Sequence, residues 1–164
     1  MQNTDNPSPA FKIFRCIYAL FYIAAGFNHF LSTQGYYAIM PEWLPAQKFL
    51  IYLSGISEIT FGFMLLFKRT QKLAAWLIIL MLLAFMPAHI YMIQKAPFML
   101  RSIEITPLIA WIRIPFQAFF IWWAWIYTIS YTEPVEVWKA KAVVFFYFIK
   151  SITRFLRKFI QFAF

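Results

Sequence analysis

Long apolar runs separated by short polar connections dominate the chain from residue 13 to residue 131. A helix that crosses a bilayer requires about 20 residues, and four of the runs reach that length. They cover residues 13–32, 49–67, 73–93 and 108–131. In lipid, a helix satisfies its backbone polar groups internally, so the pattern predicts four transmembrane α-helices. These form a bundle over residues 11–132, preceded by a short polar tail at residues 1–10.

The connections between the spans differ in length and charge. Residues 68–72 are short and basic, which predicts a tight antiparallel hairpin of the second and third spans. Residues 36–48 are longer and contain two prolines and a tryptophan, which favours a segment folded onto the mouth of the bundle. Lys and Arg gather near both ends of the chain and at 68–72. The positive-inside rule therefore predicts a multi-pass protein with both termini in the cytoplasm.

Residues 133–164 have a different pattern, with basic and apolar positions on opposite faces of a helix. The basic face is formed by Lys150, Arg154, Arg157 and Lys158. This predicts an amphipathic helix on the cytoplasmic face, bound to anionic lipid headgroups. A fifth span from residue 142 onward is the alternative, but three of these bases would then lie deep in the bilayer.

Composition supports an integral membrane protein of the all-α class. Hydrophobic residues make up 63% of the 164 residues and charged residues 13%, whereas a soluble domain is about 45–50% apolar. The formal charge of +9 raises the alternative of nucleic-acid binding. We reject this alternative because the bases flank apolar spans and no nucleic-acid-binding motif is present. The single cysteine, Cys16, excludes an internal disulfide.

Glu58 lies in the middle of the second span. A charge at the centre of a membrane helix costs roughly 2.5–3.5 kcal/mol when it is unpaired, so Glu58 should face protein and have a partner. Gly55 and Gly62 are small positions on the same helix, where a neighbouring helix can approach closely. The sequence therefore predicts a polar site on one side of this span.

The other spans carry polar residues at similar depth in the predicted outer half of the membrane. Arg113 is the predicted counter-ion of Glu58, because a guanidinium can bind a carboxylate through two parallel hydrogen bonds. The hypothesis is a pocket that opens to the outer face under residues 36–48. The alternative is a cluster that only holds the helices in register. Candidate catalytic residues are Glu58, Arg113 and His29, and candidate ligand-binding residues are His89, Gln117, Asn28, Trp43 and Tyr91.

Metal binding and familiar catalytic chemistry have weak support. His29 and His89 with a carboxylate could bind iron, copper or zinc, but they come from separate spans without a metal-binding spacing, so we predict no metal site. The chain has no phosphate loop, no GxSxG sequence and no redox CxxC sequence. Whether the protein is an enzyme is therefore left open.

Several short segments resemble the DoxX-like family of small four-span bacterial membrane proteins. They lie in order along residues 20–127 and are Ala25 to Phe30, Ile39 to Pro41 with Leu44-Pro45, Leu53 to Gly55 with Glu58 and Gly62, Ala74 to Trp76, Pro87 to Met92 and Arg113 to Gln117. Relatives usually carry Asn at the position of His89. The resemblance implies a four-helix bundle in the bacterial inner membrane.

The resemblance also suggests a function, since some DoxX-like proteins are named as subunits of quinone-linked oxidoreductases, including thiosulfate:quinone oxidoreductase. The leading hypothesis is a membrane subunit or binding module of such a redox system, with a quinone as candidate cofactor. A redox protein and a second copy of the chain are candidate partners. The alternatives are a non-enzymatic assembly or chaperone subunit, and a small transporter or proton pathway.

Overall fold

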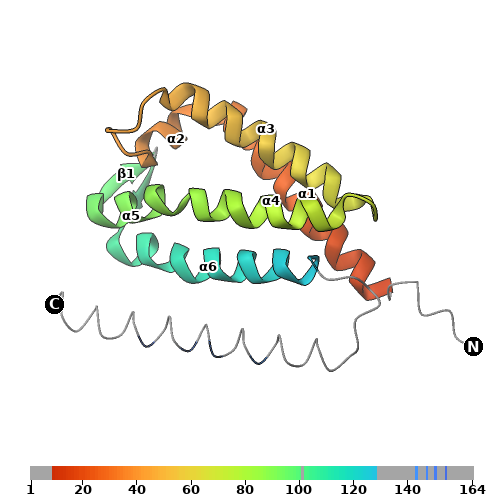
Figure 1. The fold of residues 1–164 in the computed structure, drawn as a ribbon. Helices are drawn as coiled ribbons and strands as arrows, with labels where there is room; N and C mark the ends of the chain where they lie inside the picture. Colours follow the sequence, from red (N-terminus) through yellow and green to blue (C-terminus); the bar gives the residue numbers. More distant parts are fainter. Residues whose placement is uncertain are drawn as a thin grey trace, which may run out of the picture.

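The computed structural model describes residues 9–100 and 102–128, and the single positions 143, 147, 150 and 154. Its elements, in chain order, are α1 (Pro9–Leu31), α2 (Thr33–Ile39), α3 (Gln47–Leu66), α4 (Gln71–Ala84), α5 (Met86–Lys95), β1 (Phe98–Leu100), β2 (Ile103–Ile105) and α6 (Pro107–Ile126) (Figure 1). The prediction of a mostly helical protein is confirmed.

Four helical segments in the described residues are long and apolar enough to cross a membrane. They are α1, α3, the combined stretch Gln71–Lys95 and α6, and they correspond to the four predicted spans. Large apolar side chains such as Phe14, Leu20 and Leu80 point outward rather than into the bundle, as expected for helices surrounded by lipid. The four apolar helices indicate a multi-pass membrane protein.

The third span is divided into two helices. α4 ends at Ala84 and α5 begins at Met86, with Phe85 between them and Pro87 in the first turn of α5. Proline has no backbone N–H and disrupts the helical hydrogen-bond ladder, although it is well tolerated in the first turn of a new helix. The interruption allows α5 to carry His89 in a separate short helix at one end of the bundle (Figure 1).

Glycines bring α1 and α3 into close contact. A Cβ atom on Gly26 would lie 2.6 Å from the carbonyl oxygen of Gly55, and a Cβ atom on Gly62 would lie 2.9 Å from the carbonyl oxygen of Ala19. The two backbones therefore touch where a side chain would separate them, which is the usual way that small residues pack membrane helices. The close approach predicted at Gly55 and Gly62 is confirmed.

A polar and aromatic cluster holds the other end of the bundle together. Arg15 is only 8% exposed, and its Nη1 donates a hydrogen bond of 2.6 Å to Oε1 of Gln71. Gln71 Nε2 in turn donates to the carbonyl oxygen of Tyr127 at 3.2 Å. From the sequence, Arg15 is only one of the basic residues near the N-terminal end, whereas the fold buries it as a link between α1, α4 and the end of α6.

The connections at the end of the molecule where α5 lies contain more secondary structure than predicted. Residues 36–48 begin inside the short helix α2. The connection between α5 and α6 contains an antiparallel hairpin that pairs Phe98 with Ile105. Both lie at the same end of the molecule as α5 (Figure 1). Each strand of this hairpin has only three residues, which is too short for a strand pattern to be recognised in the sequence.

Two predictions fall wholly or mainly outside the described residues. Residues 1–8 of the predicted polar tail are not described, and residues 9–10 already belong to α1. In the predicted amphipathic segment, the described positions Val143, Tyr147, Lys150 and Arg154 are helical and exposed. Arg157 and Lys158 lie outside the described residues, so the predicted surface helix stays a prediction.

Candidate functional site

A cavity of about 170 Å³ lies at the end of the bundle where α2 and α5 meet the longer helices. Residues from α1, α2, α3, α5 and α6, with two from the adjoining connections, line it. They are His29, Tyr36, Ile39, Met40, Ile51, Ser54, Glu58, Phe85, Ala88, His89 and Arg113. A mostly apolar wall with a few polar groups is typical of sites for small molecules.

Glu58 and His29 form the most buried polar pair of the cavity. Each residue is 6% exposed, and His29 Nε2 lies 3.4 Å from Glu58 Oε2. The pair joins α3 to α1 at the glycine contact, since a Cβ atom on Gly55 would lie 2.8 Å from Cβ of His29. The small size of Gly55 therefore permits the approach that places the imidazole beside the carboxylate.

The other imidazole nitrogen of His29 determines where a proton must lie. His29 Nδ1 is 3.1 Å from the carbonyl oxygen of Ile51 and 3.0 Å from Oγ of Ser54, while Ser54 itself donates to the same carbonyl. A carbonyl oxygen only accepts hydrogen bonds, so we assign the Nδ1 proton to this contact. A favourable contact between Nε2 and Glu58 then requires a further proton, carried by either the imidazole or the carboxyl group.

Glu58 retains capacity to bind a further donor. Its Oε2 atom is buried and accepts no hydrogen bond from the described residues; the approach of His29 at 3.4 Å is longer than a normal hydrogen bond. A buried acceptor without a donor is costly. A hydroxyl or N–H group of a molecule in the cavity would remove that cost.

One ring nitrogen of His89 has a hydrogen-bond partner, and the other has none among the described residues. Its Nε2 lies 3.1 Å from Oε1 of Gln117, whose amide nitrogen donates to the carbonyl oxygen of Leu82. Because Gln117 therefore presents an acceptor, we assign the His89 proton to Nε2, which leaves Nδ1 as an acceptor. Nδ1 is buried and has no hydrogen-bond partner in the described part of the chain.

Arg113 does not bind Glu58. Within residues 9–100 and 102–128, the ion pairs are His29–Glu58 and Lys95–Glu42, and the side chain of Arg113 forms no hydrogen bond. The predicted Glu58–Arg113 ion pair is thus wrong, because the glycine contact brings His29 from α1 to the carboxylate instead. The half-buried guanidinium lines the cavity with its donors available.

Tyr36 of α2 covers His29. The two rings stack with centroids 3.8 Å apart and an interplanar angle of 23°, and the hydroxyl group of Tyr36 accepts a hydrogen bond of 3.0 Å from Asn28. Burial raises the pKa of Tyr36 above its ordinary value of about 10. Tyr36 also borders a second cavity of about 240 Å³, which Asn28 and Arg113 line as well.

Residues 18–128 match a family described as "Domain of unknown function (DUF8561)". The chain belongs to the DUF8561 family. The matched segment contains all residues that line the cavity, whereas Arg15 lies before it. Neither the search of curated proteins nor the search of solved structures gave a match.

Four of the eight predicted site residues of this DUF8561 protein line the cavity, namely His29, Glu58, His89 and Arg113. Gln117 and Asn28 lie behind them and hold His89 and Tyr36. The predicted convergence of polar residues from all four spans is therefore observed. In the described part of the chain, no three His, Cys, Asp or Glu residues are arranged to bind a metal ion.

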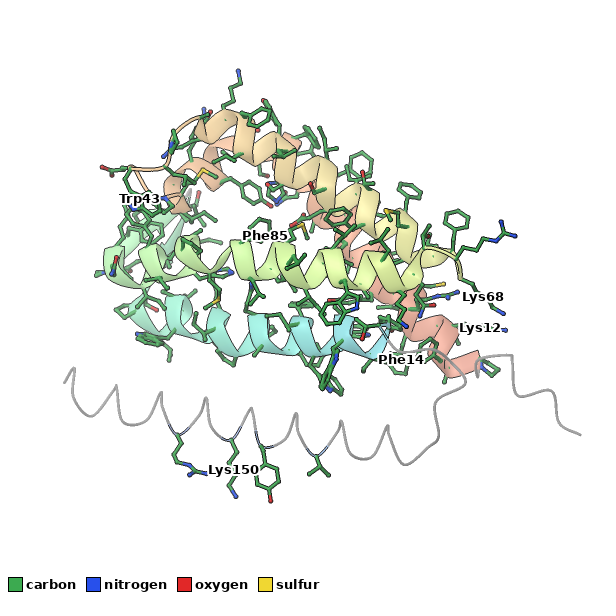
Figure 2. The ribbon with its side chains drawn as sticks, in the orientation of Figure 1. Lys12, Phe14, Trp43, Lys68, Phe85 and Lys150 are labelled. Atoms are coloured by element: carbon green, nitrogen blue, oxygen red, sulfur yellow. The ribbon has the colours of Figure 1, made fainter. Side chains whose placement is uncertain are left out.

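The other two predicted residues lie outside the cavity. Trp43 is 69% exposed and lies on the surface at the same end of the molecule as α2 and α5 (Figure 2). Tyr91 donates a hydrogen bond of 3.2 Å to Glu42, whose carboxylate is 3.9 Å from Nζ of Lys95. Trp43 and Tyr91 therefore belong to the surface of the molecule near residues 42–43 rather than to the cavity wall.

Sequence reasoning missed Tyr36 and Ser54 as individual site residues. In the sequence, Ser54 is singled out only as part of the segment Leu53 to Gly55, and Tyr36 only as one end of the connection expected to cover the bundle. The available signal for Ser54 was its position four residues, or one helical turn, before Glu58, which places both on the same face of α3.

Proposed function

We propose that this DUF8561 protein binds a small amphiphilic molecule of the quinone type, as a membrane subunit or binding module of a quinone-linked redox system. The observation that carries the proposal is the buried Oε2 atom of Glu58, which accepts no hydrogen bond from the described residues. Glu58 lines the same cavity as Arg113 and His89. A resemblance to the DoxX-like family, in which quinone-linked subunits are named, favours this class of ligand.

The polar groups of the cavity match the two redox forms of a quinone head. Arg113 can donate hydrogen bonds to a carbonyl oxygen, while Glu58 and Nδ1 of His89 can accept from hydroxyl groups. At about 30 Å³ per water molecule, the cavity of about 170 Å³ has room for roughly five or six waters, which is comparable to one substituted ring. A bound quinone would supply the two-electron chemistry, and an external redox partner would exchange the electrons.

His29 and Glu58 would transfer a proton to and from such a ligand. Their contact holds one proton in addition to that on Nδ1 of His29, and Ser54 keeps the imidazole oriented through the carbonyl of Ile51. A group that can hold a proton beside a buried ligand is the basis of general acid–base chemistry. In this proposal, the pair would give the proton of this contact to the ligand when the ligand is reduced, and would take it back from the resulting hydroxyl group when the ligand is oxidised.

We further infer an orientation in a bacterial inner membrane. Lys12 and Lys68 lie at one end of the molecule and Trp43 at the other (Figure 2). The positive-inside rule then favours cytoplasmic termini and a cavity near the opposite face. The basic C-terminal segment, with Lys150 and Arg154 exposed, is proposed to bind anionic lipid.

The test is mass spectrometry of organic extracts from protein purified in mild detergent. We expect a stoichiometric quinone in the wild type and in the control Glu42→Gln, whose carboxylate is exposed at the same end of the bundle. Glu58→Gln and Arg113→Met should lower quinone affinity by about ten- to a hundredfold, because each removes a hydrogen-bond partner that is charged or buried. Wild-type protein that carries only bulk lipid and binds no added quinone would contradict the proposal.

Arg113→Met separates ligand binding from a purely structural role. The Glu58–His29 pair joins two helices, which also fits an assembly or chaperone subunit in which the polar cluster holds the bundle together. Arg113 has no hydrogen bond or ion pair within the described residues, so its replacement should leave the unfolding temperature within about 2 °C of the wild type. If Arg113→Met unfolds the protein and no quinone is found, the structural function is favoured.

A further inference from the structure

A mainly apolar groove of about 440 Å³, distinct from the two cavities described above, lies between α3 and α4. The two helices are joined at one end by residues 67–70 and diverge toward the other end (Figure 1). On α3 the groove is lined by Leu50, Leu53, Ser57 and Phe61, and on α4 by Leu77, Leu80, Met81 and Ala84, together with Leu44. These positions recur at helical spacing, so each helix turns one continuous stripe toward the groove.

The dimensions of the groove fit a hydrocarbon chain. Its lining on α3 extends from Leu50 to Phe61, and the eleven helical steps between these residues correspond to about 16 Å of helix. That is about half of the hydrocarbon core of a bilayer, which is about 30 Å thick. The groove borders helices that are long and apolar enough to span a membrane, so a chain could enter it from lipid without crossing water.

The groove adjoins the polar cavity. Met40, Ser54 and Phe85 line both spaces. Phe85 lies at the break between α4 and α5 and projects into the space between α4 and α3 (Figure 2). Methionine is flexible and adapts its shape readily. Met40, which lines both spaces together with Phe85, can therefore move aside for a hydrocarbon chain that passes from one space to the other.

We infer that the groove binds the hydrocarbon tail of the same amphiphile whose polar head occupies the cavity, and that this molecule enters sideways from the membrane between α3 and α4. The inference rests on the proposed function and adds the ligand class: one small polar head attached to a long unbranched or isoprenoid chain. The head meets Glu58, His89 and Arg113 beyond Phe85, while the tail lies along Ser57 and Ala84.

The groove can be blocked without altering the cavity, because Ala84 and Ser57 line only the groove. Ala84→Trp and Ser57→Phe place large side chains on opposite walls. Ala24→Trp is the matched control, since Ala24 is another exposed alanine on a spanning helix and lines neither space. The two probes are decylubiquinone, which carries a ten-carbon tail, and the corresponding tailless dimethoxy-methyl-benzoquinone. Binding is measured in one detergent by separating and quantifying bound and free probe.

We expect each blocking variant to weaken binding of the tailed probe by about tenfold or more and binding of the tailless probe by less than about twofold, since overpacking affects only the filled subsite. The control should leave both probes unchanged. Comparing each probe with itself across variants removes the effect of its partition into detergent. A folded blocking variant that binds the tailed probe as tightly as the wild type overturns the tail site and leaves the head site intact. Wild-type protein that binds neither probe contradicts the proposed function itself.

Discussion

The contact between α1 and α3 predicts that replacing Gly26 by alanine destabilises the protein. A Cβ atom at this position would lie 2.6 Å from the carbonyl oxygen of Gly55 and 2.9 Å from the backbone nitrogen of Ile59, with Cγ1 of Ile59 at 2.7 Å. Two of these three atoms belong to the backbone of α3. No change of side-chain rotamer can relieve those contacts, so the helices must move apart.

Two opposing effects determine the size of the change. Overpacking a well-packed interior costs typically about 1–3 kcal/mol, and rigid backbone contacts favour the upper end of that range. In the middle of a helix, alanine is more favourable than glycine by about 1 kcal/mol. The expected net loss is therefore about 2 kcal/mol. The steric effect exceeds the gain in helix propensity.

The loss is measured by reversible unfolding in mixed micelles, with circular dichroism at increasing fractions of denaturing detergent. Ala24→Val is the control, because it adds side-chain volume on the exposed face of the same helix and should change the stability by less than about 0.5 kcal/mol. Gly26→Ala should also weaken ligand binding, since His29 follows one turn later and reaches Glu58 only across this contact. A variant as stable as the wild type, or more stable, would refute the argument from backbone contact.

Three further predictions concern other parts of the molecule. Gln71→Leu should lower stability by about 1–3 kcal/mol. Combining it with Arg15→Met should cost less than the sum of the two single changes, because each single change already removes the 2.6 Å hydrogen bond. A double-mutant cycle measures this coupling. The raised pKa of Tyr36 means that the unfolded chain releases this proton first as the pH rises above about 10. Wild-type stability should therefore fall more steeply than that of Tyr36→Phe as the pH rises above about 10, and parallel curves of unfolding temperature against pH would contradict this. Trp43→Ala should leave quinone binding unchanged in the assay that detects the loss in Glu58→Gln, since Trp43 lies outside the cavity.

The sequence by itself determined the four apolar spans, the hairpin between the second and third of them and the meeting of polar residues from every span. These features depend on quantities that act along the chain: the length of an apolar run, the absence of backbone donors at proline and the cost of an isolated charge in lipid. The break before α5 was not predicted, because residues 73–93 were expected to form one span. Glu58 with Gly55 and Gly62 indicated that a neighbouring helix would approach this face of the second span.

Only the tertiary structure decided which partner Glu58 has. Counting residues gives the depth of a side chain in a helix but not the direction in which the helix is rotated against its neighbours. Arg113 and His29 were both at a suitable depth, and the contact of Gly26 with Gly55 selected His29. The same contact left Arg113 lining the cavity without a partner among the described residues, which made it a candidate for binding a ligand.

Tertiary structure likewise decided the role of the short segments. Helix α2 and the strand pair are too short to have a recognisable period, so their formation depends on packing at the end of the bundle. That packing placed Tyr36 over His29 and left Trp43 outside. The divergence of α3 from α4 opened the groove beside the cavity. Sequence determined which residues could meet inside the membrane, and the close packing of two helices determined which of them do, because contact distances depend on backbone shape and not on position along the chain.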